Sequence, residues 1–447
     1  MRRRFNLKKG LNLAIAGGLP HGISPALLVE PDKVAVTPDD FPGLKPKLDV
    51  AEGDLVAQGQ ALMHSKTCDG IKLTAPVSGR VTAVVRGARR KIERVVLEAS
   101  GEAPAPVLFK ADLHVKESVQ SALLTSGLWA MLRQRPYDIV PDPAIAPRDI
   151  FVTAMDTAPL APNPEDAVAG KTAELNAAAK ALRLFTSGRI YIGVAAGSRL
   201  PDIDGCEMVE FNMLHPAGNA GIQAANLAPV NKGDVVWTLD IVTLCRIGTL
   251  LLTGKLDTSA LVAVTGPEVE SPHVVRTTYG ARIFKLVNGN IRPDGVHHRI
   301  ISGNILTGIP EGADGFIRFP YRQITVIREG DDRDEFMGWA SVSPSKLSVS
   351  PSFPGKFLGK LFNPDARLNG GRRAMIMSGV YDRYIPMDIL PEYLIKAIEA
   401  RDIDQMEALG IYEIAPEDFA LAEYADPSKL ELQRIVRRGL DHMRSEV

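Results

Sequence analysis

The sequence has few cysteines, and their spacing is not that of a metal site. Cys68, Cys206 and Cys245 are the three thiols in 447 residues, and no two of them form a Cys-x-x-Cys pair. An iron-sulfur cluster takes four cysteine ligands, so this chain cannot hold one with its own thiols. The odd count fits a reducing compartment in which thiols stay unpaired. The eight histidines are scattered, only His297 and His298 being neighbours, and we expect no metal site.

Long apolar runs and an excess of one charge are also missing. Residues 241–252 form the best apolar run, but they are fewer than the roughly 18 residues needed to span a membrane and include Arg246. The basic residues 2–4 are followed by Asn6 to Lys9 instead of an apolar stretch, so we expect no signal peptide. The 52 Lys and Arg nearly balance the 53 Asp and Glu, which argues against nucleic acid as a partner.

Nucleotide-binding loops are absent too. Residues 16–22 (AGGLPHG) are rich in glycine but have neither the lysine of a phosphate loop nor a Gly-x-Gly-x-x-Gly spacing. That spacing follows none of the predicted strands, which argues against binding of a nicotinamide dinucleotide. We therefore predict no catalytic residue and no cofactor bound covalently or by motif.

Residues 49–81 are the stretch around which the N-terminal part is organised. Short apolar segments alternate with turns at Gly53 and Gly59, a pattern typical of a small β-sandwich, and it resembles the biotinyl/lipoyl barrel-sandwich module. In carriers of that kind the modified lysine lies a fixed distance before the Ala-Pro of the second half. Here that position is Cys68, and Lys66 lies two residues short of it. We interpret the module as an unmodified scaffold.

From about residue 107 the pattern changes to α/β. Helical spacing covers residues 118–132 and 172–185, and strands are predicted at 149–154, 190–195 and 209–214. Strands that alternate with crossover helices favour a parallel sheet of Rossmann type. Ligands bind such sheets beyond the carboxyl ends of the strands, where we predict three loops. The loops are residues 155–159, 196–199 and 215–221; the Gly-x-x-Gly of the last is also compatible with simple close packing.

The remaining chain is predicted to form a small mixed sheet, an arm and a helical end. Strands alternate with Gly and Pro turns from residue 261, and residues 341–371 are rich in Ser, Pro and Gly, as in an extended arm. From Asp388 the pattern is helical. Asp402 and Gly410 bracket one short helix, and Asp426 is expected to cap a last one.

Six segments together carry a family resemblance. They are GLKPKLDVAEGDLVAQGQAL (43–62), TAPVSGRVTAVVRGARR (74–90), RDIFVTAMDTAPLAPNP (148–164), HPAGNAG (215–221), SGVYDRYIPMDILPEYL (378–394) and YADPSKLELQ (424–433). In this order and over the full length, the chain resembles the NqrA family of bacterial sodium-translocating NADH:quinone reductases.

The resemblance implies an α/β multidomain fold and a place in a complex. The expected division is a lead (1–25), a biotinyl/lipoyl-like barrel-sandwich (26–105), a Rossmann-like parallel α/β domain (106–255), a β-grasp domain of the SLBB type (256–330), and an extended arm with a C-terminal helical domain (331–447). It implies a peripheral location on the cytoplasmic face of the bacterial inner membrane, with membrane subunits as the chief partners. The complex would couple NADH oxidation and ubiquinone reduction to Na⁺ export, with NADH, flavins and iron-sulfur centres in partner subunits.

The resemblance also implies that this chain binds ubiquinone. Such a pocket needs an apolar wall and one or two donors to the carbonyl oxygens of the quinone. The candidates are Trp129, Arg133, Arg135, Phe151, Asp156, His215 and Gly218. Trp129 could instead pack in a core, and the two arginines could lie on a solvated face or at a contact with another chain. A stand-alone flavin or NADH oxidoreductase and a biotin- or lipoate-type carrier remain the alternatives for the whole chain.

Overall fold

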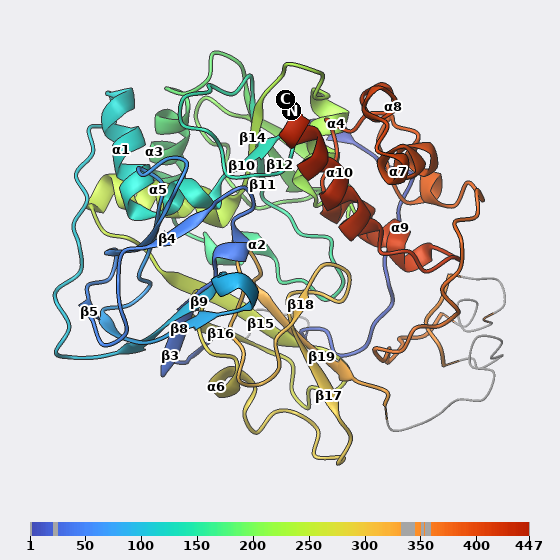
Figure 1. The fold of residues 1–447 in the computed structure, drawn as a ribbon, viewed down its shortest axis with the longest axis horizontal. Coiled ribbons are helices and arrows are strands. Elements are labelled where there is room, and N and C mark those ends of the chain that lie inside the picture. Colours follow the sequence, from blue (N-terminus) through green and yellow to red (C-terminus); the bar gives the residue numbers. More distant parts are fainter. Residues whose placement is uncertain (1, 21–25, 332–344, 350–352, 354–358, 447) are drawn as a thin grey trace.

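The computed structural model describes residues 2–20, 26–331, 345–349, 353 and 359–446. Parts of the expected arm, residues 341–344, 350–352 and 354–358, therefore lie outside the described residues. Figure 1 shows three β-rich bodies and a layer of C-terminal helices, α7 to α10, drawn in red. The predicted α/β multidomain fold class is confirmed.

The barrel-sandwich consists of two facing sheets. One sheet has the order β3-β9-β8-β5 and the other β4-β6-β7. The strands are β3 (Lys33–Val36), β4 (Pro46–Leu48), β5 (Leu55–Val56), β6 (Ala61–Ser65), β7 (Lys72–Thr74), β8 (Gly79–Arg86) and β9 (Ile92–Ala99). Gly53 and Gly59 have φ of +93° and +84°, as the predicted corners require. Cys68 lies on the hairpin between β6 and β7.

The second domain holds a six-stranded sheet of order β1-β13-β12-β11-β14-β10. Its strands are β1 (Arg3–Phe5), β10 (Arg133–Arg135), β11 (Ile150–Thr153), β12 (Ile190–Ala195), β13 (Glu207–Phe211) and β14 (Val236–Asp240). All pairs are parallel except β10 with β14. After β13 the chain returns to the far side of β11, so the strand order reverses between β11 and β14.

Helices cover both faces of this sheet because its strands alternate between two cores. Ile150 and Val152 of β11 pack in the core that includes α3 (Thr172–Leu182) and α5 (Ile241–Thr253). Phe151 between them belongs to a second core, with α4 (Ala220–Leu227). A short α2 (Pro164–Ala167) precedes α3. Within the described ranges, no helix is both long and apolar enough to cross a membrane.

The expected helix over residues 118–132 is broken. The α-helix α1 (Lys116–Ser126) ends at Gly127, which has φ +84°, and residues 128–131 then form a 3₁₀ turn. A left-handed glycine is a common helix terminator, because it satisfies the last carbonyls without steric cost. Residues 128–131 are apolar because the 3₁₀ turn is also buried. The apolar spacing of the sequence therefore continues past the end of the helix at Gly127.

The N-terminal segment departs from the expected division into consecutive domains. Instead of forming a separate lead, β1 pairs with β13 in the α/β sheet. Residues Leu27 and Leu28, expected in the barrel, form β2, which pairs with β16 of the third domain. Both strands are only two or three residues long, so no apolar period marks them in the sequence.

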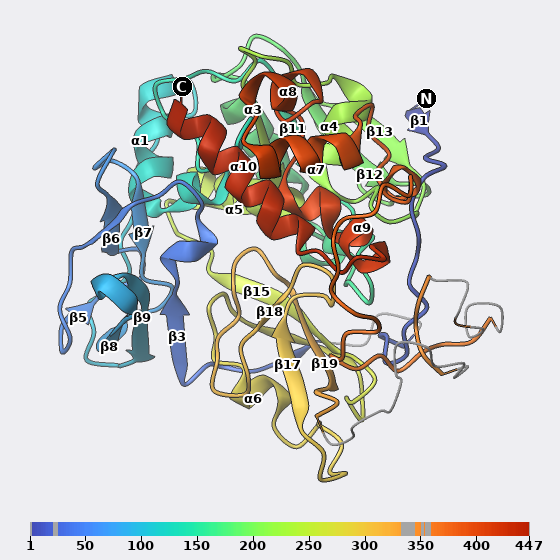
Figure 2. The ribbon, with the colours of Figure 1, turned by 45° about the vertical axis from the view of Figure 1, so that its right-hand side comes forward.

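The third domain is a mixed sheet of order β18-β17-β19-β15-β16-β2 with one short helix. Its elements are β15 (Ser259–Thr265), β16 (His273–Thr278), α6 (Phe284–Val287), β17 (His298–Ser302), β18 (Ile309–Pro310) and β19 (Gln323–Arg328). Its core holds apolar residues from β15, β16, β17 and β19. In Figure 2 this sheet lies below the α/β domain.

Four α-helices close the chain: α7 (Pro391–Ala400), α8 (Ile403–Ala408), α9 (Ala420–Ala425) and α10 (Leu432–Glu446). Asp402 caps α8 as predicted, its carboxylate accepting the Gln405 N–H at 3.0 Å. Asp426 does not cap α10, which begins at Leu432. It is fully buried and accepts the Leu430 N–H at 2.7 Å and the Tyr381 hydroxyl at 3.0 Å. Figure 2 shows the helices packed across the front of the α/β domain.

Candidate ligand cleft at the strand reversal

A cleft of about 190 Å³ lies at the carboxyl ends of β11 and β14, where the strand order reverses. This is the position at which open α/β sheets bind ligands. Three parts of the chain form its walls: the α/β domain, residues 303–323 of the third domain, and Glu417 from the 3₁₀ turn Pro416–Phe419. Its apolar wall consists of Met131, Met155, Leu239, Phe319 and Pro320. We call it the switch-point cleft.

Arg322 and two carboxylates, Asp156 and Asp240, line this cleft. Asp240 lies 3.1 Å from the Arg322 guanidinium and accepts the Thr243 N–H at the start of α5 at 2.8 Å. Burial acts to raise the pKa of Asp240, but these two contacts outweigh it and hold the pKa below its usual value. Asp156 accepts the Ala158 N–H at 2.9 Å, and burial raises its pKa. The Asp240 carboxylate is thus already engaged, by the ion pair with Arg322 and by capping the N-terminus of α5.

His215 supplies an unused neutral donor. Its side chain is buried, and burial lowers its pKa to about 4, so the imidazole is neutral at pH 7. Thr157 accepts the Gly218 N–H at 2.9 Å and lies 3.2 Å from His215 Nδ1. Because the Thr157 oxygen already accepts a hydrogen bond, its own hydroxyl proton can be donated to His215 Nδ1. In this arrangement Nδ1 carries no proton, and the imidazole proton is on Nε2. Within the described part of the chain, Nε2 has no hydrogen-bond partner.

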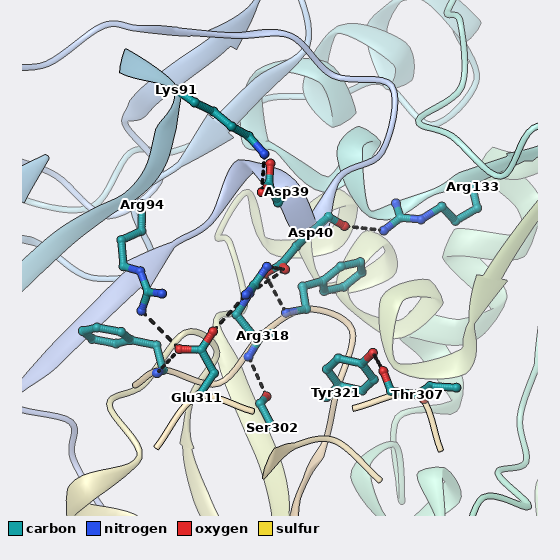
Figure 3. Close-up of polar contacts among 12 residues, drawn as sticks. Asp39, Asp40, Lys91, Arg94, Arg133, Ser302, Thr307, Glu311, Arg318 and Tyr321 are labelled. Carbon is teal, nitrogen blue, oxygen red and sulfur yellow. Dashed lines mark hydrogen bonds and ion pairs between the residues drawn. The ribbon is translucent and has the colours of Figure 1, made fainter. Parts of the chain in front are cut away.

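Arg133 lines the cleft but is already engaged. Its guanidinium donates to the carbonyl oxygens of Ala130, Leu132 and Asp40 at 3.0, 3.1 and 2.6 Å and lies over the Phe319 ring at 5.5 Å. Burial lowers its pKa. Figure 3 shows Arg133 pointing toward Asp40 of the barrel. Its contacts therefore join the α/β domain to the barrel.

A network of buried charged side chains holds the cleft wall formed by residues 318–321 in place. Arg318 lies between Asp40 at 2.6 Å and Glu311 at 2.8 Å, and Glu311 also pairs with Arg94 at 3.2 Å (Figure 3). These contacts fix the segment that continues into Phe319 and Tyr321. The Tyr321 hydroxyl donates to the Thr307 carbonyl oxygen, and burial raises its pKa to about 12. The wall formed by residues 318–321 is thus anchored on both sides.

Three of the predicted site residues do not reach the cleft. Trp129 is fully buried, donates its indole N–H to the Pro141 carbonyl at 2.9 Å and packs edge-on against Trp237 at 5.1 Å. Phe151 stacks on Tyr191 at 5.1 Å in the other core of the sheet. Arg135 forms a buried ion pair with Asp418. Trp129 thus packs in a core, and none of the three side chains lines the switch-point cleft.

The glycines of residues 215–221 serve close packing. A Cβ on Gly218 would lie 2.7 Å from the Thr157 backbone nitrogen, and one on Gly221 would lie 2.5 Å from the Arg135 guanidinium. Both positions therefore exclude side chains. Of the predicted residues, Arg133, Asp156, His215 and Gly218 do line the switch-point cleft.

The three predicted loops do not converge on one site. Residues 196–199 line a wider cleft of about 890 Å³ beside the first, which also contains His273 and Arg276 of the third domain. Met155 and Asp156 line both clefts. Phe319, Tyr321 and Arg322 also line the switch-point cleft but were not among the predicted site residues. No local pattern connects them to β11 and β14, because they belong to another domain.

His215 is expected to make stability depend on pH. Below pH 6.5 the unfolded chain protonates this imidazole, whereas the folded chain does so only near pH 4. The unfolded state then binds more protons, so the free energy of unfolding falls as the pH drops from 6.5 towards 4. The expected contribution is a loss of about 2 kcal/mol between pH 7 and pH 5. Urea denaturation at both pH values measures it. His215→Asn should show a smaller loss, and an equal loss in both proteins would contradict the assignment.

Comparisons with known proteins cover nearly the whole chain. Three family models match: the NqrA N-terminal barrel-sandwich hybrid domain at residues 5–100, the NqrA second alpha/beta domain at 114–256 and the NQRA C-terminal domain at 261–309. The chain is similar to the A subunits of the Na(+)-translocating NADH-quinone reductases of Serratia proteamaculans (38% identity), Vibrio parahaemolyticus (37%) and Pasteurella multocida (36%). Each alignment covers 99% of this chain and 100% of the relative.

Among solved structures, an NAD⁺-reducing [NiFe]-hydrogenase in the air-oxidized state aligns with a TM-score of 0.36 and 13% identity. The alignment covers 48% of this chain and 47% of that one. A likeness at this level carries no argument about function.

Proposed function

Since the chain belongs to the NqrA family, as the A subunit of a Na⁺-translocating NADH-quinone reductase, we propose that it binds the ring of a quinone in the switch-point cleft. The observation that supports this proposal most concerns His215, a residue that lines the partly apolar cleft. Its Nε2 is a buried, neutral N–H donor without an acceptor among the described residues. A quinone carbonyl oxygen is a neutral acceptor, and its binding would satisfy that donor.

The shape of the cleft favours a ring over a whole prenylated molecule. Its volume of about 190 Å³ is below the roughly 300–1,000 Å³ of pockets for drug-sized ligands. Met131, Met155 and Phe319 offer apolar and polarizable contacts to a flat ring. The isoprenoid tail would then lie outside the cleft, and binding affinity is expected to depend little on its length.

The role in the complex follows from the same family membership. We propose that the chain attaches peripherally to membrane subunits at the cytoplasmic face, and that NADH, flavins and iron-sulfur centres reside in partner subunits. The three thiols of this chain are free and far apart in sequence. The alternative for the barrel is a biotin- or lipoate-type carrier. Intact-mass measurement would then give a mass above that calculated from the sequence.

Calorimetric titration of the purified chain with a short-chain ubiquinone tests the proposal. We expect saturable binding with one site per chain. In His215→Phe the affinity should fall about tenfold, because one hydrogen bond of about 1.4 kcal/mol is lost. Circular dichroism at the titration temperature verifies that the variant is folded.

The matched control is His273→Phe, since His273 lines the wider cleft. This substitution should leave the affinity unchanged. If His273→Phe weakens binding and His215→Phe does not, the ligand occupies the wider cleft and the proposed site is wrong. Absence of saturable binding to the wild type also contradicts the proposal.

A further inference from the structure

Three potential metal ligands converge on one side of the third domain, away from the switch-point cleft. Glu268 follows β15, Asp294 precedes β17, and His298 is the first residue of β17. His298 Nε2 lies 3.4 Å from Glu268 Oε2 and 3.3 Å from Asp294 Oδ1, and the three atoms lie within 4.8 Å of one another. In Figure 2, β17 and β19 run side by side at the bottom of the molecule. His298 of β17 pairs with Arg328 of β19 across these two strands.

Two of these atoms are buried without a hydrogen-bond partner among the described residues. The side chain of Glu268 is only 4% exposed and that of His298 only 12%. Within the described residues, neither Glu268 Oε2 nor His298 Nε2 has a hydrogen-bond partner. A carboxylate oxygen left unpaired at this depth is costly, so a native structure is expected to satisfy it.

Arg328 of β19 occupies the other oxygen of each carboxylate. It donates to Glu268 Oε1 at 3.1 Å and to Asp294 Oδ2 at 2.8 Å. Both carboxylates are thereby oriented, with Oε2 and Oδ1 near His298 Nε2. The two carboxylates and Arg328 leave one negative charge in the cluster when His298 is neutral. A donor that orients the ligating carboxylates from outside is a common feature of metal sites.

The spacing of the three atoms fits ligation better than hydrogen bonding. A charge-assisted N–H to carboxylate bond is about 2.7–2.9 Å long, shorter than both observed separations. Ligands placed tetrahedrally about 2.1 Å from a Zn²⁺ ion are about 3.4 Å apart, which is the separation of Nε2 from each carboxylate oxygen.

We propose that Glu268, Asp294 and His298 form a binding site for a divalent transition-metal ion of the Zn²⁺ type. One imidazole with two carboxylates suits such ions better than Ca²⁺ or Mg²⁺, which prefer oxygen ligands alone. Asp294 is 28% exposed and lies on the open side, where water completes the coordination. The expectation of no metal site overlooked that Asp294 stands four residues before His298, while Glu268 is distant in sequence.

Zinc titration of the full-length, tag-free chain after chelator treatment tests this site. We expect one Zn²⁺ per chain by calorimetry and an affinity at least 100-fold weaker in His298→Ala. Asp294→Asn is a second variant at a more exposed position and should weaken binding at least tenfold. Replacement by Co²⁺ should give the visible absorption of a tetrahedral or five-coordinate ion.

The control is His297→Ala, at the neighbouring histidine. The side chain of His297 is 66% exposed and contacts Asp331 at 2.9 Å instead of the cluster. Its removal should leave the zinc affinity unchanged. Absence of stoichiometric zinc binding to the wild type would overturn the proposal, as would equal affinities of the wild type and His298→Ala.

Discussion

Replacing Trp129 with alanine is expected to lower the free energy of unfolding by about 3–5 kcal/mol, the usual cost of deleting a buried tryptophan side chain. The indole packs against Trp237 and Phe185 with ring centroids 5.1 and 5.8 Å apart, and its N–H donates to the Pro141 carbonyl. The substitution would remove all of these contacts and open a cavity between the sheet and α5. Chemical denaturation followed by circular dichroism measures the loss.

Trp129→Phe and Leu108→Ala provide the comparison. Phenylalanine retains an aromatic ring in the same core and should cost less than alanine, whereas Leu108 is 65% exposed and its truncation should change stability little. If Trp129→Ala is as stable as Leu108→Ala, the core assignment is wrong. At temperatures where Trp129→Ala is still folded, it should bind quinone as the wild type does, because Trp129 does not line the switch-point cleft.

Removal of the Arg135 guanidinium is expected to cost a similar 3–5 kcal/mol, because it leaves a buried carboxylate without its counter-charge. Arg135 Nη1 lies 2.9 Å from the Asp418 carboxylate and donates to the Glu413 carbonyl oxygen at 3.0 Å. The side chains of Arg135 and Asp418 are 1% and 0% exposed. Arg135→Met should therefore lower the melting temperature and expose residues 411–446 to protease, since this pair joins β10 to the C-terminal helices.

A double variant separates the lost charge pair from lost packing. In Arg135→Met with Asp418→Asn neither member of the fully buried pair is charged, so part of the stability should return. Glu417, the second carboxylate partner of Arg135 at 3.3 Å, is 47% exposed and can stay hydrated. Recovery will be incomplete, because the Asp418 carboxylate also accepts the Ala415 N–H at 2.9 Å. If the double variant is less stable than Arg135→Met by the full effect of Asp418→Asn alone, the two side chains are not coupled.

Local patterns were sufficient to predict the main secondary structure and the barrel corners. Buried strands such as β11 and β12 have continuous apolar runs, and Gly53 and Gly59 mark turns by their conformational freedom. Errors occurred where two signals overlapped. The apolar period continued through Gly127, although this glycine ends α1.

The candidate sites could be predicted only in part, because their residues come from segments far apart in the chain. His215, Asp156 and Gly218 follow predicted strands and could be placed at one edge of a sheet. Phe319 and Tyr321 reach the same cleft only through the packing of two domains. Arg135 is a charged residue in the sequence but is buried by its pairing with Asp418, 283 positions later.

The two short N-terminal strands have a consequence for the order in which the protein folds during synthesis. Arg3 of β1 pairs with Val209, and Leu27 of β2 pairs with Val275. The ribosome makes these N-terminal residues first, yet their partners emerge more than two hundred residues later. Until then, β1 and β2 cannot take their final positions in the two sheets. Nascent chains shorter than about 210 residues should therefore keep β1 accessible to protease, and those shorter than about 280 residues should keep β2 accessible. The barrel strands, from Lys33 to Ala99, are by then already made.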